Sequence, residues 1–149
     1  MASARIDLLG LEDFQLIASL YNRVFKPSRD EAFFQRRYAS RQNPLIMVAV
    51  MDNQPVGFSL GFELKPSVCF IWLYGVLPDY RRAGIASQLM EAGTAWAKQA
   101  GYTSVRMECQ NHHRPMLHLG IKQQFDIVGI RWDSDRGENL VIFEKIVLD

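Results

Sequence analysis

The sequence predicts one α/β (α+β) domain over residues 1–149, in which a mixed, mostly antiparallel sheet is flanked by helices. Three observations predict this fold class. Two amphipathic helical stretches come before three short apolar stretches rich in β-branched and aromatic residues, which are typical of consecutive strands. A strand, a helix and a strand then follow one another over residues 68–109, and such a crossover makes its two strands parallel. The length suits one compact domain.

The first elements are a short strand and two helices. The segment RIDLL at residues 5–9 is typical of a short strand. From residue 11 to residue 24 apolar side chains recur every three or four positions, which predicts an amphipathic helix. A second helix is predicted from Ser28, because Ser28 and Asp30 precede Glu31 and can cap its first turn.

Three strands follow in the middle of the chain. They are predicted at residues 45–52, 55–65 and 68–77, and the turn segments DNQ and PS separate them. Because the connections are short, the first two strands are expected to form an antiparallel hairpin, which the third joins as a meander.

The remaining elements alternate between helix and strand before a final pair of strands. Residues 84–101 place apolar side chains on one helical face and end in a glycine suited to follow a helix. A strand is predicted at 103–109. The segment RPMLHLGIKQQF, residues 114–125, has a proline suited to a first helical turn. The strands FDIVGIRW and NLVIFEKIVL, residues 125–132 and 139–148, close the chain around a charged turn.

Composition and charge exclude some function classes. The chain carries 17 basic and 16 acidic residues, so it lacks the concentrated positive charge that binding to nucleic acid or an anionic membrane requires. No apolar run approaches the roughly 20 residues of a membrane helix, and the segment MASARIDLLG lacks the pattern of a signal peptide. A cytoplasmic protein with no nucleic-acid or membrane partner is therefore expected.

The cysteines and histidines do not form a metal-binding pattern. Cys69 and Cys109 lie in apolar strands and are expected to be reduced, partly buried thiols. His112, His113 and His118 cluster without a matching cysteine or carboxylate pattern, so no metal site is predicted.

The segment PDYRRAGIAS, residues 78–87, places two arginines and a glycine where a strand meets a helix. The first turn of a helix exposes backbone N–H groups without partners, and the helix dipole adds positive potential there. Gly84 lets a ligand approach the backbone closely, and Ala86 keeps the next position small. Arg81 and Arg82 can add charge-assisted hydrogen bonds. Together these features predict a phosphate-binding turn.

The stretch VLPDYRRAGIAS, residues 76–87, resembles the acyl-CoA signature V-x-P-x-x-[QR]-x-x-G-x-[GA] of the GNAT superfamily of N-acetyltransferases. The predicted order of elements also resembles that fold over essentially the whole chain. The resemblance implies that the two parallel strands splay apart, that acetyl-CoA is the acyl donor, and that its pantetheine arm pairs with the first of these strands. It also implies a coenzyme A site formed by Gly75, Val76, Leu77, Arg81, Arg82, Ala83, Gly84, Ile85, Ala86, Ser87 and Asn111.

Acetyl transfer requires an oxyanion donor and groups that move protons. The backbone N–H of Val76 is suited to polarise the thioester carbonyl. Many members of the family have a tyrosine as proton donor in a pattern like N-x-x-A-x-x-L-Y-x-K-x-G-F. Counting back from Phe125 puts Gly120 at the tyrosine position, whereas counting forward from Asn111 puts His118 there. His118 and Tyr74 remain as candidate catalytic residues, and the identity of the acid and base is open.

The acceptor side is less specific. Glu63, Trp72 and Tyr74 lie on strands expected to approach the acceptor, with packing and solvated surface as the alternative interpretations. In this fold the loop FKPSRD, residues 25–30, and the turn WDSDRGE, residues 132–138, tend to shape the acceptor pocket. Their mixed charges select no particular amine.

These observations favour an acetyl-CoA-dependent N-acetyltransferase that acts by direct attack of an amine on the thioester. The acceptor is expected to be a small-molecule or peptide amine. The alternative is a non-catalytic domain of the same fold that binds coenzyme A as a sensor or interaction module. Apolar residues in the terminal strand VIFEKIVL are compatible with a homodimer.

Overall fold

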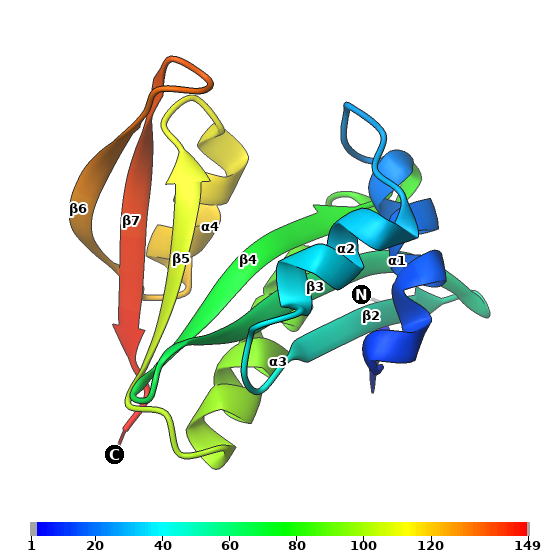
Figure 1. The fold of residues 1–149 in the computed structure, drawn as a ribbon, viewed down its shortest axis with the longest axis horizontal. Helices are drawn as coiled ribbons and strands as arrows, with labels where there is room; N and C mark the ends of the chain where they lie inside the picture. The colour runs from blue at the N-terminus through cyan, green and yellow to red at the C-terminus, as the bar shows by residue number, and fades with distance from the viewer. Residues whose placement is uncertain (1–2, 149) are drawn as a thin grey trace.

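The computed structural model describes residues 3–148 and contains a seven-stranded sheet with the strand order β1-β2-β3-β4-β5-β7-β6 (Figure 1). Every neighbouring pair is antiparallel except β4 and β5, which are parallel. This arrangement confirms the predicted fold class and the predicted meander. The strands are β1 (Arg5–Leu8), β2 (Leu45–Met51), β3 (Gln54–Lys65), β4 (Val68–Val76), β5 (Ser104–Gln110), β6 (Asp126–Asp133) and β7 (Glu138–Ile146).

Helices cover both faces of the sheet. On one face, α1 (Phe14–Asn22) and α2 (Glu31–Tyr38) lie in front of β3 and β4 in Figure 1, and on the other face lie α3 (Ile85–Gln99) and α4 (Arg114–Lys122). The predicted cap of α2 is present, because the Asp30 carboxylate accepts a hydrogen bond from the Phe33 N–H at 3.0 Å. The first predicted helix begins instead with a short 3₁₀ turn, Leu11–Asp13.

Two apolar clusters, one on each face of the sheet, form the core. Phe14, Phe34 and Phe58 lie in the cluster under α1 and α2 and are almost fully buried. Leu89 and Phe143 lie in the cluster under α3 and α4. The sheet is therefore a rigid layer between two packed helical layers, and its edges and gaps are the places where a ligand can reach the backbone.

Strands β4 and β5 pair over only four residues and then diverge. The register runs from Val68 opposite Ser104 to Ile71 opposite Met107. On the other side of β4, Ile71 pairs with Gly61 and Leu73 with Leu60, which leaves Trp72 as a bulge. A bulge bends its strand and increases the local twist. The two strands separate just beyond this bulge, and Figure 1 shows the resulting V.

The exposed apolar residues near the C-terminus lie mainly on β6 rather than on the terminal strand. In β7 the side chains of Val141 and Phe143 are buried, because β7 lies between β5 and β6. Edge strand β6 exposes Ile130 and Trp132 by 67% and 60%. In the segment VIFEKIVL itself, Ile146 and Leu148 are exposed by 74% and 62%, so the homodimer compatible with this segment stays a prediction, and β6 exposes further apolar side chains beside it.

Candidate functional site

The turn between β4 and α3 forms a concave row of backbone N–H groups. After the 3₁₀ turn Pro78–Tyr80, the backbone φ angle is +71° at Arg82 and +79° at Gly84. Alternation of this kind turns successive N–H groups toward one point and makes an anion-binding concavity. Within the described chain, none of the N–H groups of residues 82–87 donates to a protein acceptor. They lie at the N-terminus of α3, whose dipole also favours an anion.

The two arginines of the turn have different surroundings. The Arg81 Nε donates to the carbonyl oxygen of Val76 at 3.2 Å, so its side chain ties the turn back to the end of β4. Arg82 is exposed and sits at the position of positive φ. From the sequence, only one of the two is expected to point inward, and the geometry gives Arg81 the contact to Val76 while Arg82 is exposed.

The end of β4 has a free backbone edge. Leu77 N–H donates to Val56 O across β3 at 2.8 Å. Because successive residues of a strand direct their backbone groups to opposite edges, those of Val76 face the edge that β5 has left. At Gly75 a Cβ atom would lie 2.5 Å from the Phe58 ring, so the absence of a side chain there serves the packing under α1. Leu77 and Ile85 are buried and offer only their backbone.

The other arm of the V ends at the junction of β5 and α4. Asn111 is exposed, and its N–H donates to Asn139 O at 3.0 Å. His113 is the N-cap residue of α4. Burial lowers the pKa of His113, and the charges of His112 and Arg81 lower it further. The influence of Arg81 shows that the two junctions lie near each other across the opening of the V.

The positions expected to carry the proton donor lie away from this opening. Gly120 is buried, and a Cβ there would lie 3.0 Å from both Met107 and the Phe143 ring, so this position belongs to the core. His118 is exposed on α4. The Tyr74 hydroxyl is buried near Ser59, and burial raises the pKa of Tyr74 well above its usual range.

Cysteine chemistry has no support at this site. Cys69 and Cys109 are free and buried, as expected. Burial raises the pKa of the Cys109 thiol to about 11 and that of Cys69 to about 12. Both side chains therefore remain neutral thiols near neutral pH, and neither has the thiolate character of a nucleophile.

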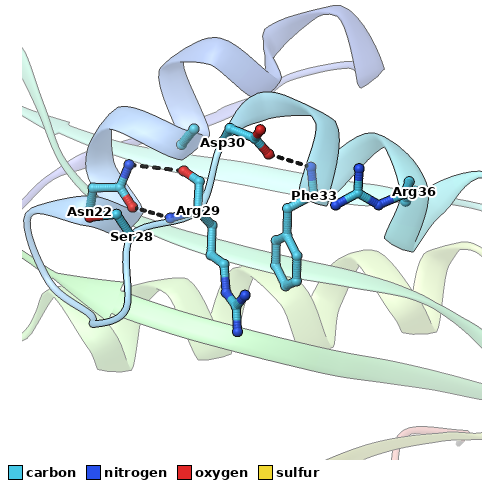
Figure 2. Close-up of a pocket in the computed structure, with 7 residues that line it drawn as sticks. Asn22, Ser28, Arg29, Asp30, Phe33 and Arg36 are labelled. Atoms are coloured by element: carbon cyan, nitrogen blue, oxygen red, sulfur yellow. Dashed lines mark hydrogen bonds between the residues drawn. The ribbon is translucent and has the colours of Figure 1, made fainter.

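Two hydrogen bonds of the Asn22 side chain fix the conformation of the loop between α1 and α2. Asn22 accepts from the Arg29 N–H at 2.7 Å and donates to the Arg29 carbonyl at 2.9 Å. Figure 2 shows Arg29 and Phe33 extending to the same side, with the Arg29 guanidinium 4.6 Å from the Phe33 ring centroid. A hollow of about 510 Å³ lies beside them, between the two helices. Phe33 in turn contacts Trp72 at the β4 bulge, with ring centroids 5.9 Å apart.

Glu63 does not approach the opening of the V. Its carboxylate accepts from Tyr102 OH at 2.9 Å and from Asn43 Nδ2 at 3.1 Å, beside the start of β4. Glu63 pairs with Cys69, in the part of β4 that is still paired with β5. It therefore lies away from the place where the strands separate, and this position does not fit the expectation that Glu63 lines the acceptor site. Trp72 lies among the aromatic residues of α2, in agreement with its packing interpretation.

Two further classes of feature are missing from residues 3–148. No group of three or more histidine, cysteine, aspartate or glutamate side chains is arranged to hold a metal ion. In the same part of the chain, no helix has the length and apolar character needed to cross a membrane.

Comparison with known protein families connects this geometry to a chemical class. Residues 13–120 match the Acetyltransferase (GNAT) family. One relative is an aminoglycoside N(6')-acetyltransferase type 1 from Acinetobacter genomosp. 13, which is 34% identical over 91 residues. That match covers 53% of this chain and 62% of the relative.

Solved structures share the fold at low sequence identity. The ribosomal-protein-S18-alanine N-acetyltransferase from Escherichia coli superposes with a TM-score of 0.84 at 17% identity, covering 98% of this chain and 95% of that one. Ard1 from Thermoplasma volcanium gives 0.81 at 22% identity, over 99% and 100% of the two chains. The protein yncA from Salmonella typhimurium, solved with its cofactor acetyl-CoA, gives 0.78 at 13%, over 98% and 95%.

Proposed function

Because the chain belongs to the GNAT acetyltransferase family, we propose that it is an N-acetyltransferase that moves the acetyl group of acetyl-CoA to an amine. The observation that carries the proposal is the row of unpartnered N–H groups at residues 82–87, which lies at the end of the free edge of β4. A pyrophosphate fits this row, since it needs several converging donors and close access to the backbone.

The residues of the chain divide the binding work between backbone and side chains. The N–H groups of residues 82–87 hold the phosphates, and the free edge of β4 leading to Val76 pairs with the amides of the pantetheine arm as a neighbouring strand would, while the Val76 carbonyl stays bound to Arg81. Gly75 and Leu77 set the path of this edge, and Asn111 faces it from the other arm.

Bound acetyl-CoA supplies an acetyl thioester to this site. Val76 N–H donates to the carbonyl oxygen as negative charge develops there. The neutral amine forms the new C–N bond while the C–S bond breaks, and the proton lost by the amine replaces the acetyl group on sulfur. Direct transfer fits the two cysteines, whose buried thiols are unsuited to an acyl-enzyme step.

Proton transfer is assigned to the side chains near the opening of the V. His113 is the strongest candidate, because its lowered pKa keeps it neutral near pH 7 and it lies close to Arg81. His118 and Tyr74 stay in the proposal as the alternatives from the sequence: His118 is exposed, as His113 is, but lies further along α4, and the Tyr74 hydroxyl is buried near Ser59.

Titration calorimetry with acetyl-CoA and thiol release over a panel of amines test the proposal. The panel contains amino acids, peptides with free N-termini, lysine peptides, spermidine and an aminoglycoside, the last because the relative from Acinetobacter is named for that substrate. Micromolar binding and amine-dependent release of coenzyme A are expected. Absence of heat at high micromolar acetyl-CoA would contradict the proposal.

A coenzyme A-binding module without catalysis is the second candidate. It is favoured by the burial of Gly120 against Phe143, which leaves no room for a tyrosine there, and by the lack of any tyrosine in α4. Tight acetyl-CoA binding with no thiol release for any amine in the panel would support this candidate over the enzyme.

A further inference from the structure

One arginine of α2 and one arginine in each flanking segment stack on aromatic rings, and we call Arg29, Arg37 and Arg41 the arginine stripe. With Phe33 between the first two, they follow a spacing of four residues, which places side chains on one side of a helix. Each guanidinium lies over an aromatic ring: Arg37 is 4.8 Å from the Trp72 centroid. Arg29 over Phe33 and Arg41 over Phe62 are at 4.6 Å and 4.5 Å.

The stripe has no carboxylate partner among residues 3–148, in contrast to the arginines across the groove. Arg106 is paired with Glu144 at 2.7 Å, and Arg131 with Glu108 at 2.9 Å. In the stripe, by comparison, the Arg29 Nε is buried without any acceptor. Burial lowers the pKa of Arg37, and the charge of Arg41 lowers it further. The charge of Glu108 acts in the opposite direction, but Glu108 is itself paired with Arg131, so the positive charges of the stripe are compensated only in part.

A groove of about 290 Å³ lies beside Arg37 and Arg41 of the stripe, at the base of the V. Arg37 and Arg41 line one side of it, and Arg106, Glu108 and Arg131 line the other. Glu108 lies one residue beyond Met107, where the pairing of β4 and β5 ends. The groove thus lies at the base of the V, on the face opposite α3.

Stacked guanidinium groups suit one kind of ligand. Their faces are occupied by aromatic rings, while their N–H edges stay free for in-plane, two-point hydrogen bonds to a carboxylate or phosphate. An additional cation in the same groove would meet four arginines and a single lining glutamate, which is already paired with Arg131. The charge balance of the groove therefore disfavours a polycationic amine.

We propose that the acceptor is an amine that also carries an anionic group, a carboxylate or a phosphate, and that Arg37 and Arg41 bind this group. The inference rests on the proposed acetyl transfer and names the substrate class of that site. Arg29, at the far end of the stripe, extends the same positive surface toward the loop between α1 and α2.

Matched pairs of amines test the inference by thiol release with acetyl-CoA. The C-terminal amide of Ala-Glu is compared with the C-terminal amide of Ala-Gln, so that only the first carries a carboxylate, and O-phosphoethanolamine is compared with ethanolamine for the phosphate, with spermidine as the polycation. The anionic member of at least one pair is expected to have a kcat/KM about tenfold higher, and the pair that shows it identifies the anion. Equal rates within both pairs, or a preference for spermidine, would overturn the inference.

Variants of the stripe assign the effect to its residues. Arg37→Gln combined with Arg41→Gln should remove the preference through a higher KM, with unchanged acetyl-CoA affinity. Arg23→Gln combined with Arg36→Gln also removes two charges, at exposed positions of the α1 C-cap and of α2 that do not line the groove, and should keep the preference. Should the double Gln variant fail to fold, Arg37→Lys with Arg41→Lys is used instead. It keeps the charges but removes the planar guanidinium groups, so a partial loss of the preference for the anionic amine is expected.

Calorimetry separates this inference from the proposed function. The C-terminal amide of Ala-Glu and O-phosphoethanolamine are titrated without acetyl-CoA into the unaltered protein and into the double variant. Binding that depends on the stripe, with no turnover of any amine, would support the anion site and contradict acetyl transfer. Turnover of amines without any preference for the anionic member would support acetyl transfer and contradict the anion site. Absence of both binding and preference overturns the inference.

Discussion

Two strand-to-helix junctions lie at the ends of the two arms of the V, and only one of them is built as an anion site. At the junction of β4 and α3, positive φ angles at Arg82 and Gly84 leave the N–H groups of residues 82–87 without acceptors. At the junction of β5 and α4, the N–H groups of Asn111 and His113 donate to Asn139 O and Gln110 O.

The difference teaches that a helix N-terminus alone does not make a phosphate site. Both junctions begin a helix, and both lie at the same end of the sheet (Figure 1). At the second junction, however, the first helical turn contains a proline, which has no N–H, and the amides of Asn111 and His113 donate to neighbouring carbonyl oxygens. Few N–H groups therefore remain for an anion. The second junction presents side chains instead, among them His113.

The largest expected effect comes from filling the N–H row. Gly84→Glu places a side chain at positive φ and a carboxylate among the phosphate donors, so acetyl-CoA affinity should fall at least about a hundredfold by calorimetry. Gly101→Glu is the matched control, because Gly101 has a φ of +94° at the other end of α3 and open space around it. Equal loss of affinity in both variants would assign the effect to backbone strain.

The two arginines of the first junction should separate into different kinetic effects. Arg81→Gln removes the 3.2 Å bond to Val76 O and should lower kcat about fivefold, since the oxyanion donor loses its support. Arg82→Gln should chiefly weaken acetyl-CoA binding and reduce its dependence on salt. Steady-state kinetics at several ionic strengths distinguish the two, and identical profiles would show that the arginines share one role.

Glycines in the two helices that follow the junctions should respond to alanine with opposite signs. Gly120→Ala forces a Cβ to 3.0 Å from Met107 and Phe143 and should destabilise the fold by about 1–3 kcal/mol. Gly93→Ala meets its neighbours at 3.7 Å or more and should stabilise α3 by about 0.5–1 kcal/mol. Denaturant unfolding measures both, and a stable Gly120→Ala variant would mean that the core near α4 has room for a larger residue.

The smallest expected effect is the pH dependence contributed by the second junction. The pKa of His113 lies below its ordinary value of 6.5, chiefly through burial. As the pH falls, His113 is therefore protonated in the unfolded chain before it is protonated in the folded chain. The stability that the folded state has with neutral His113 is complete above about pH 6.5 and is lost as the pH falls toward the folded-state pKa. In the His113→Gln variant the free energy of unfolding should depend less on pH in this window. An unchanged pH dependence would contradict the lowered pKa of His113.

Much of the fold could be predicted because its signals are local. The periodicity of residues 84–101 and the apolar strands on both sides require a crossover, and the crossover requires a parallel pair. The residues of the N–H row could be found for the same reason, since one short motif contains them. The proton donor could not, because it depends on which residues meet across the V.

Particular residues show where the sequence was insufficient. Glu63 and Trp72 both lie on strands of the meander, yet Trp72 packs against the aromatic residues of α2, whereas Glu63 accepts a hydrogen bond from Tyr102. The stripe could have been noticed from the repeat of Arg29, Phe33, Arg37 and Arg41 at four-residue spacing. Its place in a groove opposite Arg106 and Arg131 could not, because β5 and β6 are far from α2 in the sequence.

The sequence by itself determined the order of strands and helices, the crossover and the turn with Gly84, since hydrophobic periodicity and turn chemistry act over a few neighbouring residues. Only the tertiary structure decided that β4 and β5 part at the Trp72 bulge, that Gly120 is enclosed by Phe143, and that Arg37 and Arg41 face a groove lined by four arginines and one glutamate. These features depend on contacts between distant segments, and such contacts exist only once the sheet has formed.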